Sequence, residues 1–251
     1  IPSEQTSDET LATAFGLARR QGKQVIVVED RPGFYTTRIL ALYLNEALLL
    51  LEEGADVPTV DKMMVEYGFP LGPFELLDFV GMDVAGKITE VMSDHFPLDP
   101  VDISDSARRL ASVNLLGQKT NIGFYHYGPA EDGDGKTRKD FNEDIYRSLG
   151  QMSRTTPPAD VVQDRLSLMM INEAVRCLDE GILRDAADGD LGAVLGLGFP
   201  PFLGGPFQYI DQHGPDRVTK RLRDLAYQYG DRFAPTSCLV EHAERGTSFH
   251  D

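Results

Sequence analysis

Two stretches of the chain, residues 38–54 (RILALYLNEALLLLEEG) and 165–181 (RLSLMMINEAVRCLDEG), align without a gap and are identical at seven of 17 positions. Apolar residues recur at helical spacing in both. The first stretch is the most hydrophobic part of the chain, but it is shorter than a membrane span and contains Asn45 and Glu46. The pattern therefore predicts two copies of one helix that is buried in a protein core.

Each copy is followed by a Gly-Phe-Pro corner, in YGFPLGPFELLD at residues 67–78 and in LGFPPFLGGPFQYID at residues 197–211. Glycine permits a left-handed backbone, and proline favours the start of the next helix. The shared order of helix, glycine stop and corner indicates a duplication. Two copies are too few for a solenoid, so we expect a mainly α fold of two similar helical lobes that pack face to face.

The first 30 residues have a different pattern. A helical stretch ends near Gly22, and residues 24–29 (QVIVVE) then form a β-branched run that predicts a buried strand before a turn. A single buried strand would leave its backbone groups unpaired. We therefore expect a remnant of a parallel α/β sheet whose other strands lie upstream, and a chain that is a fragment.

Two later stretches interrupt the helical pattern. GFYHY at residues 123–127 and KTRKD at residues 136–140 flank a Gly/Asp-rich turn and predict a β-hairpin. Residues 148–159 are rich in Ser, Thr and Pro and predict a linker, with helical periodicity resuming at Asp164.

Composition and motifs exclude several functions. A formal net charge of −16 without a basic run argues against a nucleic-acid partner. Two distant cysteines and five histidines show no disulfide or metal-ligand spacing. Gly196-Leu197-Gly198 lacks the third glycine of a dinucleotide fingerprint and continues into Phe199-Pro200. We expect no catalytic, metal-binding or cofactor-binding residue in this chain.

The segment 30–38, DRPGFYTTR, joins the predicted strand to the first long helix. Such a junction is a natural wall for a cleft between an α/β domain and a helical domain. It could equally be a hinge between the two, and both interpretations stay open from the residues alone.

A family resemblance covers nearly the whole chain. DRPGFYTTR, NEA, EEGAD, YGFPLGPFELLDFVGMDVA and LLGQKTNIGFYHY follow one another as in the C-terminal domain of 3-hydroxyacyl-CoA dehydrogenases. NEAVRCLDEGIL and DGDLGAVLGLGFPPFLGGPFQYID resemble the extra C-terminal repeat in the α subunits of multifunctional fatty-acid oxidation complexes. The resemblance implies helical lobes like the C-terminal domain of 6-phosphogluconate dehydrogenase. It implies domains at residues 1–30 (Rossmann remnant), 31–147 (first dehydrogenase C-terminal domain) and 160–251 (second repeat).

In that family an upstream Rossmann domain binds NAD, and a His paired with a Glu removes the hydroxyl proton of a 3-hydroxyacyl-CoA. The resemblance therefore implies the substrate-facing and assembly half of a β-oxidation dehydrogenase that is inactive alone. An upstream enoyl-CoA hydratase domain and a thiolase β subunit as partner are implied too. The implied compartment is the bacterial cytoplasm, or the mitochondrial matrix in a eukaryote.

Three residues are expected to contact the acyl-CoA substrate: Phe34, Thr37 and Lys119. Thr37 stands where single-function members of the family have an Asn beside the substrate, and a hydroxyl lacks the reach of an amide. Asn121-Ile122 is a second departure, at a place where relatives carry Gly and a polar residue. Lys119 could meet a CoA phosphate or be an ordinary surface lysine.

Two other functions remain as alternatives. The chain could be a purely structural scaffold for subunits and thiolase, or it could belong to a helical-domain dehydrogenase of short hydroxy acids, against which the double Gly-Phe-Pro repeat argues. Family members with one repeat pair through their helical domains. Here the second copy could take the partner's place, so we expect this chain to be monomeric.

Overall fold

The computed structural model describes residues 1–93, 102–128, 138–150 and 154–250. The helices are α1 (Asp8–Arg20), α2 (Thr36–Glu52), α3 (Val57–Tyr67), α4 (Pro73–Val80), α5 (Met82–Ser93), α6 (Ser106–Ser112), α7 (Asp144–Leu149), α8 (Ala159–Asp179), α9 (Ala186–Leu197), α10 (Pro206–His213), α11 (Pro215–Tyr229) and α12 (Ser237–Arg245). A two-stranded sheet of β1 (Tyr125–Gly128) and β2 (Arg138–Phe141) accompanies them. The predicted mainly α fold is confirmed.

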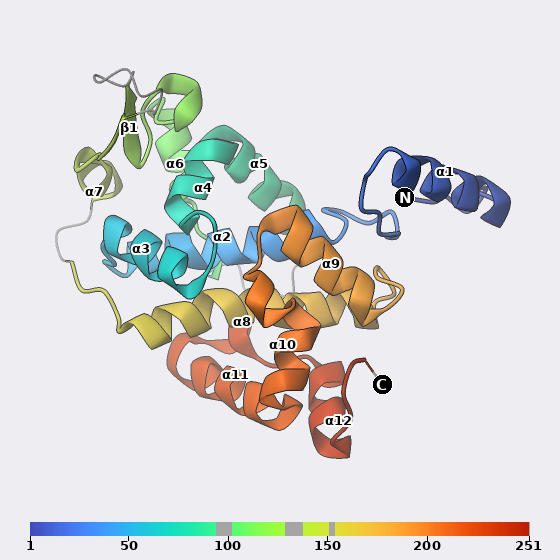
Figure 1. Cartoon of the computed structure of the whole chain (residues 1–251). Helices are drawn as coiled ribbons and strands as arrows, with labels where there is room; N and C mark the ends of the chain where they lie inside the picture. Colours follow the sequence, from blue (N-terminus) through green and yellow to red (C-terminus); the bar gives the residue numbers. More distant parts are fainter. Residues whose placement is uncertain (94–101, 129–137, 151–153, 251) are drawn as a thin grey trace.

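The two copies of the repeated helix, α2 and α8, pack along each other through the middle of the molecule (Figure 1). They run antiparallel, because Arg38 near the start of α2 binds Glu180 just beyond the end of α8. The first repeat comprises α2 to α7, and the second comprises α8 to α12. The first repeat lies mainly on one side of the α2–α8 pair, and α10 to α12 lie on the other side (Figure 1).

The repeats also interlock. Helix α3 of the first repeat contacts α8 of the second, and α9 of the second contacts α2 of the first. The buried apolar side chains accordingly form one continuous cluster that includes residues of both repeats. Because apolar burial is the main favourable contribution to folding, we expect this shared core to couple the stability of the two repeats.

The two Gly-Phe-Pro corners meet at this crossing. The Phe69 and Phe199 rings pack edge to face at 5.9 Å between centroids. Gly68 and Gly198 have φ of 120° and 74°, a backbone region that favours glycine. A Cβ at Gly198 would lie 2.6 Å from Pro70, so the corner also needs glycine for close approach.

Buried ion pairs join α2 to α8 twice, in mirrored form. Arg38 binds Glu173 and donates to Glu180 at 2.6 Å. The equivalent Arg165 donates to Glu46 at 2.7 Å and to Glu53 at 2.5 Å. Burial alone lowers the pKa of Arg38, but its hydrogen bonds to Glu180 and Glu173 and the charge of Glu173 raise it above its usual value. The pKa of Arg165 is raised in the same way by Glu53 and Glu46, so both guanidiniums stay charged inside the interface.

The helix asparagines repeat the same symmetry. The amide of Asn45 donates to the Asp102 carbonyl at 2.8 Å and accepts from the Ser104 backbone at 2.9 Å. The amide of Asn172 donates to the Ala234 carbonyl at 2.9 Å and accepts from the Thr236 backbone at 3.0 Å. Each Asn thus fixes an incoming loop of its own repeat, and the predicted duplication is confirmed in its contacts.

The N-terminal region differs from the prediction in one respect. Helix α1 forms but buries no residue, and it stands away from the helical body (Figure 1). Residues 24–29 do not form a regular strand: Val28 makes an isolated bridge to Leu183, and Glu29 donates to the Ile182 carbonyl at 3.0 Å. Since the described chain offers this segment no neighbouring strand, its β-branched pattern has no sheet to join.

The predicted hairpin is confirmed, with β1 and β2 antiparallel and Tyr125 opposite Phe141. Residues 129–137 of its turn lie outside the described residues. Of the predicted linker, residues 154–158 have no regular structure, whereas Ser148 and Leu149 close helix α7. Helix α8 begins at Ala159 instead of Asp164, directly after the two prolines.

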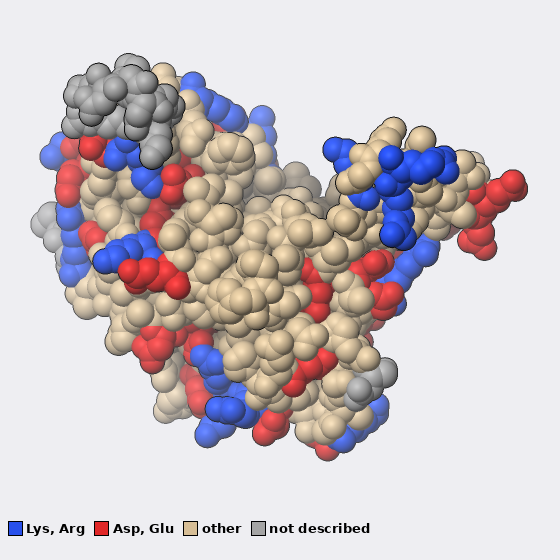
Figure 2. Space-filling model, in the orientation of Figure 1, with Lys and Arg blue, Asp and Glu red and all other residues tan. Residues whose placement is uncertain are grey.

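Figure 2 shows few charged side chains over the middle of one face, where α9 and its corner lie, whereas Lys, Arg, Asp and Glu occupy its periphery. The exposed apolar residues include Leu195 in α9 and Phe202 in the turn that follows it. Among the described residues, no helix is long and apolar enough to span a bilayer.

The mirrored ion pairs predict a large effect of Arg165→Met. The Arg165 side chain has 0% exposure, and its loss leaves buried Glu46 with one fewer cation. We expect the free energy of unfolding to fall by about 3–5 kcal/mol, measured by urea denaturation. Arg147→Met is the control, because the Arg147–Asp144 pair is exposed and should contribute at most about 1 kcal/mol. Equal losses of unfolding free energy in the two variants would contradict a stabilising role for the buried Arg165 pairs.

The internal pairing of the repeats predicts a monomer. Helix α2 already buries its apolar face against α8 of the same chain, and intramolecular pairing has an effective concentration in the millimolar range. Sedimentation equilibrium at low micromolar concentration should give a mass near 27.8 kDa. A dimer that persists on dilution would show that the repeats pair between chains instead.

Candidate functional site

An apolar cavity, here called the α2 slot, lies between α2, α4 and α5. On α2 it follows one helical face from Thr37 to Leu48, a length of roughly 16 Å at the usual rise per residue. The slot is lined by Thr37, Leu40, Ala41, Leu44, Asn45, Leu48, Leu77, Val80, Ala85, Ile88 and Thr89. Among the described residues, none of this lining is charged.

Burial gives the slot a direction. Thr37, Leu40 and Ala41 are partly exposed in the first turns of α2, whereas Leu44 and Leu48 are buried. The Asn45 amide is occupied by its two backbone partners. The volume is about 210 Å³, which is below the roughly 300–1,000 Å³ of a site for a whole small molecule. The slot therefore has space for an apolar part of a ligand, with the Thr37 hydroxyl near its exposed end.

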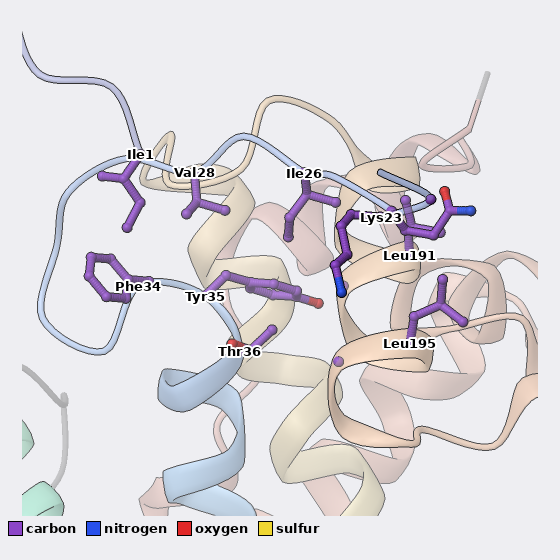
Figure 3. Close-up of a pocket in the computed structure, with 13 residues that line it drawn as sticks. Ile1, Lys23, Ile26, Val28, Phe34, Tyr35, Thr36, Leu191 and Leu195 are labelled. Carbon is purple, nitrogen blue, oxygen red and sulfur yellow. The ribbon is translucent and has the colours of Figure 1, made fainter. Parts of the chain in front are cut away.

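A second, larger hollow of about 500 Å³, here called the linker cavity, lies where the segment 30–38 meets helix α9 (Figure 3). Phe34 and Tyr35 approach from the N-terminal side, and Leu191 and Leu195 line it from α9. Lys23 extends into this space in Figure 3. This hollow is not the cleft between an α/β domain and the helical domain that the sequence suggested, because its described opposite wall is α9 of the second repeat. Whether the segment 30–38 forms the wall of such a cleft or a hinge stays a prediction.

Tyr35 holds the segment 30–38 against α9. Its hydroxyl donates to the Gly189 carbonyl at 2.9 Å, and burial raises the pKa of Tyr35 well above its usual value. The ring also packs beside Gly192, where a Cβ would lie 3.2 Å from it. Tyr35 is therefore a protonated structural contact and not a candidate acid or base.

Phe34 begins this connection in a strained backbone. Its φ of 48° follows Gly33 at 74°, and its side chain is 39% exposed in the wall of the linker cavity. A non-glycine residue in the left-handed region is uncommon and often marks a functional turn. These two residues with positive φ, Gly33 and Phe34, lead the chain into α2.

Lys119 lies in neither cavity. Its ammonium binds the Asp83 carboxylate at 2.7 Å, and both side chains are about 40% exposed. The hydrogen bond from Lys119 lowers the pKa of Asp83. The structure thus places the three predicted residues apart: Phe34 at the linker cavity, Thr37 at the α2 slot, and Lys119 at a surface ion pair.

Sequence reasoning missed most of the α2 slot. Leu40, Leu44 and Leu48 have the spacing of an ordinary core-facing helix face. An apolar stripe gives the same sequence pattern whether it packs against another helix or lines a cavity. The available signal was the small side chain of Ala85 where the second repeat has Val218. Only an alignment extended through α5 shows it.

The described residues do not fit a dinucleotide or a metal ion. Gly198 ends α9 and is followed by Phe199-Pro200, so no helix N-terminus with free N–H groups is available there for a pyrophosphate. No cluster of His, Cys, Asp or Glu suited to a metal is found in the part of the chain that the structure describes.

Comparison with known proteins agrees with this architecture. The family model of the 3-hydroxyacyl-CoA dehydrogenase C-terminal domain matches twice, at residues 33–127 and 161–248. The fatty acid oxidation complex subunit alpha of Shewanella frigidimarina (strain NCIMB 400) is 44% identical over 250 residues, which is 100% of this chain and 34% of that protein. The chain thus spans about a third of the length of this relative.

Two solved structures share the fold. A 3-hydroxybutyryl-CoA dehydrogenase from Escherichia coli K12 superposes with a TM-score of 0.73 at 23% identity, covering 96% of this chain and 66% of that one. The dehydrogenase part of multifunctional enzyme 1 from C. elegans gives 0.67 at 23%, covering 96% and 54%. At this identity they show the fold alone.

The duplicated family match falls on the two repeats that share the mirrored ion pairs and meet at the two glycine corners. The chain therefore belongs to the family of the 3-hydroxyacyl-CoA dehydrogenase C-terminal domain and carries two copies of that domain.

Proposed function

We propose that this chain is the substrate-facing and assembly half of an NAD-dependent 3-hydroxyacyl-CoA dehydrogenase, within the α subunit of a fatty-acid oxidation complex. The observation that carries the proposal is the α2 slot, an uncharged cavity with the hydroxyl of Thr37 near its exposed end. An acyl-CoA has the matching chemistry: an apolar tail joined to a polar reacting end.

The role of the chain in this reaction is binding and positioning. Oxidation at C3 needs a base for the hydroxyl proton and an acceptor for hydride, and the described residues around the slot supply neither. Burying the tail holds the substrate in one orientation and excludes water from its apolar part. The hydroxyl of Thr37 can donate one hydrogen bond and accept two at the polar end.

Phe34 and Lys119 stay secondary candidates for substrate contact. Phe34 lies only three residues before Thr37 and has an exposed ring. Lys119 is partly exposed, and its ammonium could exchange Asp83 for a CoA phosphate at little cost, since exposed ion pairs contribute at most about 1 kcal/mol.

The remaining parts of the proposal concern the longer protein. NAD is bound by an upstream Rossmann domain, since the sequence of this chain contains no complete dinucleotide fingerprint. The same subunit also carries enoyl-CoA hydratase activity and assembles with a thiolase β subunit, in the cytoplasm of a bacterium or the mitochondrial matrix of a eukaryote. The 44% identity to a fatty acid oxidation complex α subunit supports this context. The alternative is a purely structural scaffold, which the sparsely charged middle of the face in Figure 2 would suit.

The first test concerns the cofactor. Isothermal titration calorimetry of NADH into the 251-residue chain should show no saturable binding, because the sequence contains no complete dinucleotide fingerprint. The whole subunit is the positive control and should bind NADH. A micromolar dissociation constant for the isolated chain would place the cofactor site here and refute the division of roles.

The second test distinguishes a substrate wall from a scaffold. A 3-hydroxybutanoyl-CoA with a diazirine at the acyl end, photolysed with the whole subunit, should label the peptide that contains Phe34 to Arg38. Excess unlabelled 3-hydroxybutanoyl-CoA should abolish this labelling, and free CoA serves as the control for tail-independent binding. Labelling confined to other domains would favour the scaffold.

A further inference from the structure

The α2 slot has a counterpart in the second repeat, and the two are not equivalent. Helices α5 and α11 align without a gap after Gly81 and Gly214. Ala85 corresponds to Val218, and Thr89 corresponds to Leu222. Val218 and Leu222 are both fully buried. The larger side chains therefore occupy in the second repeat the volume that is open in the first.

The exposed end differs as well. Thr37 corresponds to Asp164, and Ile88 corresponds to Arg221. Arg221 donates to Asp164 at 2.9 Å and to the Tyr209 hydroxyl at 2.9 Å, which closes this end with a charged pair. A hollow of about 160 Å³ remains there, and its lining includes Asp160, Asp164, Arg221 and Asp224. An apolar chain would have to desolvate these charges to enter.

Resting on the proposed function, we propose that Ala85 and Thr89 determine the acyl-chain length that the enzyme accepts, and that the second repeat binds no acyl chain. Both residues lie on one face of α5, four positions apart, and both line the α2 slot. Their small side chains leave space on the α5 side of the slot. A tail that extends beyond the reacting end occupies this space.

The residues of the second repeat supply the test. The double variant Ala85→Val/Thr89→Leu copies Val218 and Leu222 into the first repeat and adds about three methyl-sized groups to the slot. Thr89 can be replaced without leaving a buried donor unpaired, because its hydroxyl only bonds back to the Ala85 carbonyl of its own helix at 3.0 Å. Each buried methylene changes affinity roughly four-fold.

The measurement is the ratio of kcat/KM for 3-hydroxyhexadecanoyl-CoA to that for 3-hydroxybutanoyl-CoA in the whole subunit. We expect the ratio to fall by about 50-fold in the double variant, and by a smaller factor in Thr89→Leu. Ala187→Leu, an exposed alanine in α9, and Leu222→Thr in the second repeat are the controls and should keep the wild-type ratio. Thermal unfolding checks that each variant is folded.

Three outcomes overturn the inference. If both kcat/KM values are retained in the folded double variant, the tail lies elsewhere. If both values fall by the same factor, the variant disturbs the enzyme generally. A changed ratio in Leu222→Thr means that the second repeat also selects chain length. If the double variant does not fold, Thr89→Leu alone decides by the same ratio. Failure of the proposed function itself would appear differently, as absence of 3-hydroxybutanoyl-CoA oxidation by the wild-type subunit.

Discussion

The buried pairing of α2 with α8 is the constraint on which the rest of this structure depends. Arg38 near one end of α2 binds Glu173 and Glu180, and Arg165 binds Glu46 and Glu53 in the same way. A slip of one turn would separate the buried members of these pairs, Arg38, Arg165, Glu46 and Glu173, from these partners, at a cost of several kcal/mol per ion. The pairs therefore select one antiparallel register. The elements that pack on the two helices, including both corners and both cavities, are positioned by that register.

Much of this architecture follows from residues that can be aligned by eye. The repeated Arg, Asn and Glu of the two long helices predict a duplication, and the two glycines of the corners predict close approach. What the sequence does not show is which side chains meet inside each repeat. Tyr125 donates to Asp61 at 2.7 Å, and His250 bonds to Asp211 at 2.7 Å and lies 3.2 Å from Asp190. Tyr125 and His250 occupy equivalent positions in the two repeats but differ in chemistry. A sequence alignment alone could therefore not identify them as equivalent.

The candidate site was harder to predict than the fold for a physical reason. Thr37 could be identified through a family resemblance, but a cavity is defined by side chains that are small or absent, and sequence patterns report those that are present. Ala85 is an ordinary helix residue until α2 and α4 are placed around it. Lys119 shows the opposite case: its charge suggested a phosphate contact, and the structure pairs it with Asp83, thirty-six positions away in sequence. Likewise, the β-branched residues 24–29 predicted a strand, and among the described residues Val28 makes only an isolated bridge to Leu183.

Duplication explains how one repeat can keep an open slot. Apolar walls that face a cavity lose packing contacts, so an unfilled slot lowers stability relative to a filled one. In a symmetric dimer both subunits would carry the same slot and bear that cost twice. Here the second copy is free to differ, and Val218 and Leu222 fill its slot while Arg221 and Asp164 close the end. Since one continuous apolar core joins the repeats, the tighter packing of the second repeat also stabilises the first. The asymmetry between the copies is thus the physical condition under which the first repeat can leave space for a ligand.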